Sequence, residues 1–119
     1  MLNIIVEFRK GILFVRLEGE LTKKTYLKLD QEVTSLIKDN GIRNVVFNIE
    51  NLTKIDIKGI NSLYYNYEIC NYNNGKIMVC GLKDDKIKNR FKHSRLLNYM
   101  YEISDELAAI DIFNAWKVN

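Results

Sequence analysis

The spacing of apolar residues changes along this chain, and the change restricts the folds that the chain can adopt. Residues 2–9 and 12–18 alternate between apolar and polar side chains, which is typical of half-buried strands, and Lys10-Gly11 predicts a tight turn between them. From residue 22 onward, segments whose apolar residues have helical spacing alternate with short, largely apolar runs that are typical of buried strands. The predicted strands are 2–9, 12–18, 44–49, 76–81 and 99–103, and the predicted helices are 22–39, 57–73, one that starts at Asp84-Asp85 and one that starts at Ser104.

This order, a hairpin followed by alternating helices and strands, implies an α/β fold. We expect a single domain over residues 1–119, with a mixed, mostly parallel sheet of four to five strands and about four flanking helices. The opening strand should be antiparallel to its neighbour, with Leu2, Ile4, Val6 and Phe8 on its buried face. The chain lacks proline and has six glycines, so its loops should be few and short.

Composition limits the classes of function. The net charge of +3 is too small to indicate a nucleic-acid partner, and no apolar run approaches the ~20 residues of a membrane span. The first residues lack the basic leader and the small-residue cleavage site of a signal peptide. Cys70 and Cys80 are too few for a disulfide framework, and Cys80 lies in an apolar run, so we expect reduced thiols. We therefore expect a cytoplasmic protein with no membrane segment and no direct nucleic-acid partner.

Residues of the kinds that carry catalysis or bind metals are scarce. His93 is the only histidine, and no flanking motif supports a nucleophile pair. This histidine and the two cysteines do not have the spacing of a zinc site, and the glycines stand singly, so no phosphate-binding loop is present. We expect a protein that is not an enzyme and that carries no cofactor and no metal.

Two surface features each allow two interpretations. The stretch 83–95 is the most basic part of the chain, and it is either a solvated helix face or a site for an anionic partner. Tyr65, Ile69 and Tyr72 form a second apolar stripe on the helix 57–73. This stripe is either a protein interface, such as that of a homodimer, or a sign that the helix is buried on more than one side.

The junction between the strand at 44–49 and the helix at 57–73 is the most informative segment. Asp56 is well placed as the N-cap of that helix, because its carboxylate can accept hydrogen bonds from the free amides two or three residues on. Sites in α/β sheets form where the carboxyl end of a strand leads to a helix N-terminus. Thr22 is a similar candidate cap for the first helix, and Asn40-Gly41 is a candidate stop signal.

Segments spread along the chain carry one more signal. They are Val15–Leu21, Ile42–Ile49, Leu52–Asp56, Gly59, Gly75–Gly81, Ile87–Phe91, Ser94 and Leu96. Together they resemble the STAS domain, which sulphate transporters and anti-sigma factor antagonists share, and the closest likeness is to the small stand-alone antagonists. The resemblance covers nearly the whole chain, and the order and length of the predicted elements agree with it.

The resemblance implies a function. An antagonist of this type binds an anti-sigma factor that is also a serine kinase, and binding frees a sigma factor for transcription. The kinase phosphorylates a serine in an Asp-Ser-Ser-Gly-like motif at this helix start, phosphorylation blocks binding, and a phosphatase reverses it. The expected contact surface is the helix start with the loop from Glu20 to Thr22. The candidate partner-binding residues are Glu20, Thr22, Asp56, Ile57, Lys58, Gly59, Ile60 and Ser62.

This chain departs from the motif at its centre. It reads Asp56-Ile57-Lys58-Gly59, so Lys58 stands where the resemblance places the phosphorylated serine. Lysine cannot form the serine ester, and its charge is opposite to that of phosphoserine, so we expect the phosphorylation switch to be lost. Lys58 is then either a surface residue whose ammonium reaches solvent or a residue that meets an acidic patch on a partner. Ser62, one turn further on, has no context that marks it as a replacement acceptor. Two alternatives stay open: a diverged interaction or scaffold domain, including a homodimer, and a domain that holds a nucleotide or another anion through Lys58 and the helix start.

Overall fold

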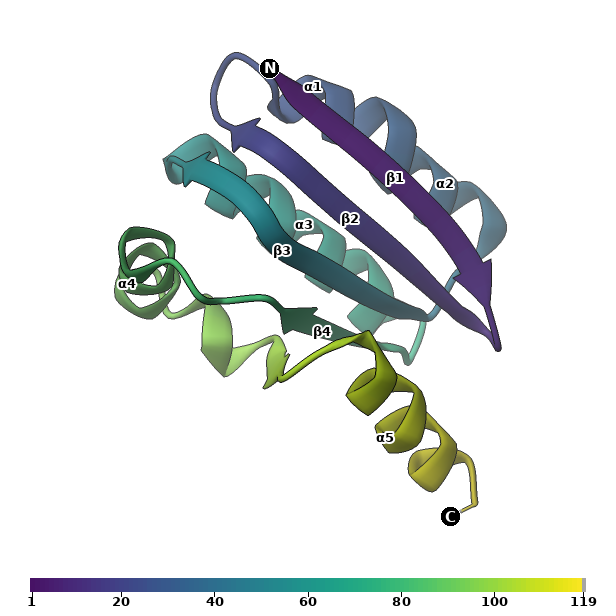
Figure 1. The fold of residues 1–119 in the computed structure, drawn as a ribbon. Coiled ribbons are helices and arrows are strands. Elements are labelled where there is room, and N and C mark those ends of the chain that lie inside the picture. Colours follow the sequence, from purple (N-terminus) through teal and green to yellow (C-terminus); the bar gives the residue numbers. More distant parts are fainter. Residues whose placement is uncertain (119) are drawn as a thin grey trace.

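Five strands form one mixed sheet in this computed structural model, which describes the backbone of residues 1–118 and the side chains as far as Trp116. The strands are β1 (Leu2–Arg9), β2 (Ile12–Leu21), β3 (Asn44–Ile55), β4 (Lys76–Cys80) and β5 (Tyr101–Ile103). They lie side by side in the order of the sequence (Figure 1). β1 is antiparallel to β2 and all other neighbours are parallel, so the predicted sheet with an opening hairpin is confirmed.

The helices follow the strands in the predicted order. They are α1 (Tyr26–Leu29), η1 (Asp30–Thr34), α2 (Ser35–Asn40), α3 (Ile57–Tyr72), α4 (Asp85–His93), η2 (Leu96–Asn98) and α5 (Glu106–Val118). The one helix predicted over 22–39 is divided, because η1 is a π-helical turn between α1 and α2. The N-cap of α1 is Thr25 and not Thr22 as predicted, because the Thr22 hydroxyl accepts from the Lys24 amide at 3.3 Å in a turn that precedes the helix. The predicted stop is confirmed, because Gly41 ends α2 with a left-handed φ of 59°.

Helices cover both faces of the sheet. α1, α2, α3 and α4 pack on one face, where Leu63 and Phe91 belong to the larger apolar layer. α5 covers the opposite face, where Phe113 belongs to the smaller layer (Figure 1). Neighbouring side chains of a strand point to opposite faces, so Val15 of β2 joins the larger layer and Phe14 the smaller one. Two covered faces explain why the inner strands are apolar at consecutive positions.

The edge strand β1 is less buried than its sequence predicts. Leu2 is buried and Ile4 is half-buried, but Val6 is 44% exposed and Phe8 is 61% exposed. The predicted face is right, because Val6 and Phe8 pair with Val15 and Leu13 of β2, whose side chains point into the larger layer. The far half of β1 lies at the edge of the sheet, where neighbouring side chains cover it on one side only.

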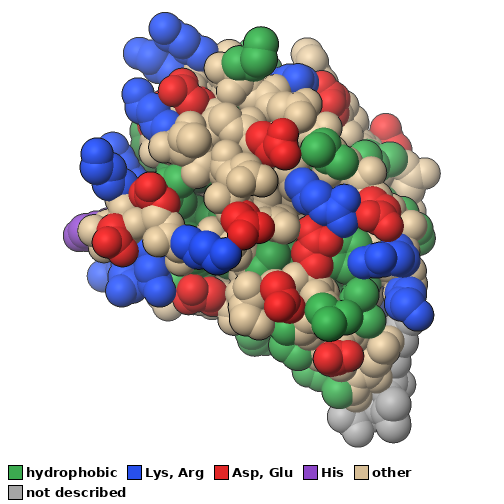
Figure 2. All heavy atoms as spheres, in the orientation of Figure 1, with side chains coloured by type: hydrophobic (Ala, Val, Ile, Leu, Met, Phe, Trp, Pro, Cys, Tyr) green, Lys and Arg blue, Asp and Glu red, His purple; other side chains and the backbone are tan. Residues whose placement is uncertain are grey.

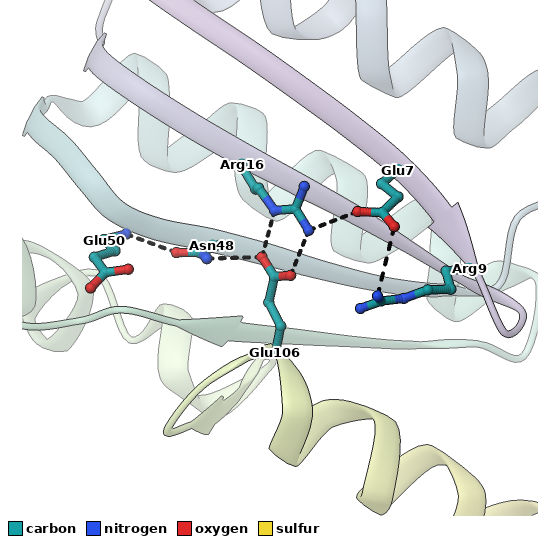
Figure 3. A network of polar contacts seen from close by, with 6 residues as sticks. All are labelled: Glu7, Arg9, Arg16, Asn48, Glu50 and Glu106. Atoms are coloured by element: carbon teal, nitrogen blue, oxygen red, sulfur yellow. Dashed lines mark hydrogen bonds and ion pairs between the residues drawn. The ribbon is translucent and has the colours of Figure 1, made fainter.

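A polar network joins α5 to the sheet (Figure 3). The carboxylate of Glu106, the first residue of α5, accepts hydrogen bonds from Arg16 Nε at 2.8 Å, Arg16 Nη2 at 2.7 Å and Asn48 Nδ2 at 2.9 Å. Arg16 also pairs with Glu7 of β1 at 2.9 Å. The hydrogen bond from Arg16 lowers the pKa of Glu106, and the hydrogen bonds to Glu106 and Glu7 raise the pKa of Arg16. Charge therefore adds to apolar packing in holding α5 against β2 and β3.

Candidate functional site

The N-terminus of α3 lies at the ends of two parallel strands. The sequence predicts that this strand ends at residue 49, but β3 continues to Ile55. Most of the segment that was expected to be a loop is therefore strand. β2 extends to Leu21, and the two strand ends pair through Glu20 with Lys54 and Leu21 with Ile55. One residue, Asp56, then separates β3 from α3. This convergence of strand ends and a helix start is the place where parallel α/β sheets build their sites.

Asp56 holds the junction together. As predicted, it is the N-cap of α3, because its Oδ1 accepts a hydrogen bond from the Gly59 amide at 3.0 Å. Its Oδ2 accepts from the Lys23 amide at 2.9 Å, so the same carboxylate also fixes the turn after β2. Burial raises the pKa of Asp56, but hydrogen bonds from the backbone amides of Lys23, Gly59 and Lys58 outweigh burial, and the pKa lies below its ordinary 3.8. The carboxylate is therefore ionised and engaged within the fold at neutral pH.

Gly59 lets α3 approach the sheet closely. A Cβ atom at this position would clash with the carbonyl oxygen of Leu21 and would lie only 2.8 Å from Cγ1 of Ile55. The first turn of α3 thus packs directly on the backbone of β2, with no side chain between them. Asp56 and Gly59 together make the helix start a fixed platform.

Lys58 lies on the exposed side of this platform. Its ammonium nitrogen is 5.9 Å from the centre of the Tyr26 ring, which is within the range of a cation–π contact. Lys58 and Tyr26 line a shallow hollow of about 190 Å³ between α3 and the α1–η1 segment. The floor of this hollow includes Ser62, whose hydroxyl donates to Asp30 Oδ1 at 2.9 Å.

The eight candidate residues do not share one environment. Glu20, Ile57 and Lys58 are exposed, and the exposed fraction of Ile57 is 61%. Asp56 is half-buried through its two hydrogen bonds. The other four candidates are buried, namely Thr22, Gly59, Ile60 and Ser62.

The structure adds residues that the sequence reasoning missed. Lys23, Lys24, Lys54 and Asn61 are exposed at the same corner of the molecule. No local pattern marks them, because they meet through the pairing of β2 with β3 and through the bond between Lys23 and Asp56, which joins positions 33 residues apart.

The two surface features identified in the sequence are both exposed. Tyr65 is 46% exposed and Tyr72 is 88% exposed, and they line a groove with Lys38 beside the half-buried Ile69. In the basic stretch around α4, Lys83 forms an ion pair with Glu50 at 2.8 Å and Lys88 one with Glu102 at 3.8 Å, while Lys86, Arg90 and Lys92 are exposed.

Groups that could support redox or metal chemistry are dispersed. Cys70 and Cys80 are buried free thiols, and burial raises the pKa of each to about 12. His93 Nδ1 lies 2.8 Å from the Asn89 carbonyl oxygen. Within the described residues, no three histidine, cysteine, aspartate or glutamate side chains gather as metal ligands would. No described helix combines the length and apolar character that crossing a membrane needs.

Known proteins share this sequence pattern and fold. The sequence model of the STAS domain matches residues 3–110. An anti-sigma F factor antagonist from Paenibacillus polymyxa is 29% identical over 79 residues, which are 66% of this chain and 68% of that protein. An anti-sigma factor antagonist from Mycobacterium paratuberculosis has a TM-score of 0.83 at 16% identity over 94% of this chain and 93% of that one. The Bacillus antagonist SpoIIAA in its unphosphorylated form has a TM-score of 0.75 at 16% identity over 94% of this chain and 98% of that one.

Proposed function

The chain belongs to the STAS domain family, and from this premise we propose that it is an anti-sigma factor antagonist, a regulatory protein that binds an anti-sigma factor in the cytoplasm and thereby affects sigma-factor-dependent transcription. The observation that carries the proposal is the fixed, exposed start of α3, which Asp56 and Gly59 hold at the ends of β2 and β3. The names of the Paenibacillus relative and of the structural neighbours support it. In this role the chain acts by binding and not by catalysis.

The proposed contact surface has an outer and an inner part. Glu20, Ile57 and Lys58 are exposed and would touch the partner directly. The other candidates, Thr22, Asp56, Gly59, Ile60 and Ser62, support these three from within the fold. This division explains how a short surface is kept in one shape, since each exposed residue stands on backbone that is fixed by a cap, a close contact or a buried hydrogen bond.

We further propose that the partner is of the serine kinase type and that its phosphorylation of this helix start is lost. SpoIIAA has been solved in a phosphorylated and an unphosphorylated form, whereas Lys58 here offers an ammonium group in place of a hydroxyl. Ser62 is the one serine of α3, and it is 5% exposed with its hydroxyl bonded to Asp30. A kinase cannot reach it without opening the contact between α3 and η1.

Binding is tested with the purified anti-sigma factor kinases encoded in the same genome. We expect calorimetry to show binding of one of them, and Ile57→Glu to weaken it strongly, because the change puts a charge into the centre of the contact surface. Leu107→Glu is the matched control, since Leu107 is a 67% exposed apolar residue on α5, across the sheet. If none of the kinases binds, or if both variants bind as the unchanged chain does, the proposal is wrong.

The lost switch is tested by incubating the same kinase with ATP and this chain. We expect no phosphate on the unchanged chain and phosphate on the Lys58→Ser variant, measured by intact mass. Lys54→Ser serves as the control, because Lys54 is also exposed but precedes the helix start. Phosphate on the unchanged chain would show that another residue has taken over the switch.

A second candidate function is self-association through α3. The exposure of Tyr65 and Tyr72 in one groove favours it, because tyrosine is enriched in protein interfaces. Sedimentation at several concentrations tests it, with Tyr72→Ser as the variant that should shift a dimer toward monomer. A chain that sediments as a strict monomer at every concentration rules this candidate out.

A further inference from the structure

We infer that the contact surface at the start of α3 is built for an acidic protein surface. The inference rests on the proposed function for the identity of the partner, but its argument concerns the charge of this chain. We call the exposed residues Lys23, Lys24, Lys54 and Lys58, together with Ile57, the lysine face.

The four lysines come from three elements that the fold brings to one corner. The backbone amide of Lys23 is bonded to the Asp56 carboxylate, which places the turn with Lys23 and Lys24 beside the start of α3. Lys54 stands at the end of β3, paired with Glu20 of β2. Lys58 is in the first turn of α3. Figure 2 shows lysine and arginine side chains at the corner where β2 and β3 end, with an acidic side chain among them, and further basic side chains over α4.

The lysines of this corner outnumber the carboxylates near them. Glu20 is exposed opposite Lys54, the charge of Asp56 interacts with that of Lys23, and Asp30 lines the same hollow as Lys58. None of the four lysines forms an ion pair within the described part of the chain, where Lys83 and Lys88 of the α4 region do. The free amides at the start of a helix add partial positive charge to such a corner.

α3 also breaks a rule that the other long helices follow. The first turn of α4 contains Asp85 and that of α5 contains Glu106, and a carboxylate there stabilises a helix through its dipole. The first turn of α3 contains no acidic residue and has Lys58 instead. Local rules are commonly broken at functional sites, where binding compensates for the cost. Asp56 supplies one carboxylate as the N-cap, and an acidic partner would add the negative charge that the first turn itself lacks.

An exposed apolar residue makes a protein the better partner than a nucleic acid. Ile57 is 61% exposed at the start of α3, next to Lys58 in the sequence, so the face combines an apolar side chain with charged ones, as protein interfaces do. The α4 region is the natural comparison. Lys86, Arg90 and Lys92 are exposed there as well, but no large apolar side chain is exposed on that helix.

The first test uses an oligoglutamate peptide as the probe and follows the backbone amides of the isotopically labelled chain by NMR. We expect the peptide to change the chemical shifts of the amides in the lysine face more than those in α4. The double change Lys54→Glu and Lys58→Glu should remove the changes in the lysine face. The control double change Lys86→Glu and Arg90→Glu carries the same net charge and should leave them. A short DNA duplex is titrated in parallel. The inference fails if α4 responds as strongly as the lysine face, or if DNA shifts the lysine face more than the peptide does.

The second test uses the anti-sigma factor kinase that binds this chain. Lys54→Glu with Lys58→Glu should weaken binding about tenfold or more, with most of the loss in the association rate at low salt, because rim charges steer encounter. If the kinase binds the unchanged chain and both double variants alike, the inference is wrong and the proposed function stands. If no kinase binds but the peptide maps to the lysine face, the proposed function is wrong and the acidic preference stands.

Discussion

Replacing Glu106 by glutamine tests whether the polar network is what fastens α5 to the sheet. The substitution keeps the size of the side chain but removes its charge, and it places an amide NH₂ where one carboxylate oxygen faced the guanidinium of Arg16. Glu106 now accepts three hydrogen bonds at 2.7 to 2.9 Å, two of them from Arg16. Glutamine cannot accept all three.

The expected loss follows from the exposure of the pair. The side chains of Arg16 and Glu106 are 30% and 17% exposed, so the pair lies between a surface ion pair and a buried one. Exposed pairs contribute ~0.2–1 kcal/mol, and breaking a buried pair costs ~3–5 kcal/mol. We therefore expect Glu106→Gln to lower the free energy of unfolding by about 2 kcal/mol at neutral pH.

Urea denaturation followed by circular dichroism measures this loss. Glu102→Gln is the matched control, because Glu102 contacts Lys88 only at 3.8 Å with both side chains more than a third exposed, and it should change stability by less than about 0.5 kcal/mol. If Glu106→Gln and Glu102→Gln lower the free energy of unfolding by the same amount, the polar network is not what holds α5 against the sheet.

The same comparison has a pH dependence of known sign. The pKa of Glu106 is lowered below its ordinary 4.5, chiefly by the hydrogen bond from Arg16, so the folded state prefers the ionised form. The ionised Glu106 contributes its full share to the free energy of unfolding above the pKa that it has in the unfolded chain. This share is lost as the pH falls through the pKa of Glu106 in the folded chain. The gap between the unchanged chain and Glu106→Gln should therefore narrow below about pH 4.5. A gap that is constant down to acid pH would show that packing, and not charge, causes the loss.

Three further predictions concern stability and reactivity. Asp56→Ala should cost about 1–2 kcal/mol in urea unfolding, since it removes the cap of α3, and the cost should shrink in acid because the pKa of Asp56 is lowered in the fold. Gly59→Ala should destabilise by about 1–3 kcal/mol, because its Cβ meets the Leu21 carbonyl; a gain in stability, as alanine gives in an open helix, would contradict the close contact. Cys70 and Cys80, each with a pKa of about 12, should react with a thiol reagent at pH 8 only as fast as the chain unfolds, and rapid labelling of the folded chain would argue against their burial.

Local signals predicted much of the fold correctly. The hairpin, the alternation of strands and helices, the Asp56 cap and the Gly41 stop all depend on residues close together in sequence, so they could be predicted without a structure. The end of β3 could not. Residues 50–55 include polar side chains, and they are strand because their backbone pairs with β2, which side-chain patterns do not reveal.

The candidate site divides in the same way. The segment Asp56-Ile57-Lys58-Gly59 is visible in the sequence as a helix start, but the role of Ser62 is not. Ser62 is a candidate partner-binding residue by its place in the sequence, and only the structure shows that its hydroxyl lies 2.9 Å from Asp30, 32 positions away in sequence. Which side of a helix turn is exposed depends on the element that packs against it.

The sequence by itself determined the order of the elements, the Asp56 cap and the Gly41 stop, because each of these is a property of neighbouring residues. Only the tertiary structure decided that Lys23, Lys24, Lys54 and Lys58 share one corner and that Val6 and Phe8 stay exposed at the sheet edge. The physical reason is that charge density and burial are sums over neighbours in space. Those neighbours are set by strand pairing and by single contacts such as Lys23 with Asp56, which no local pattern contains.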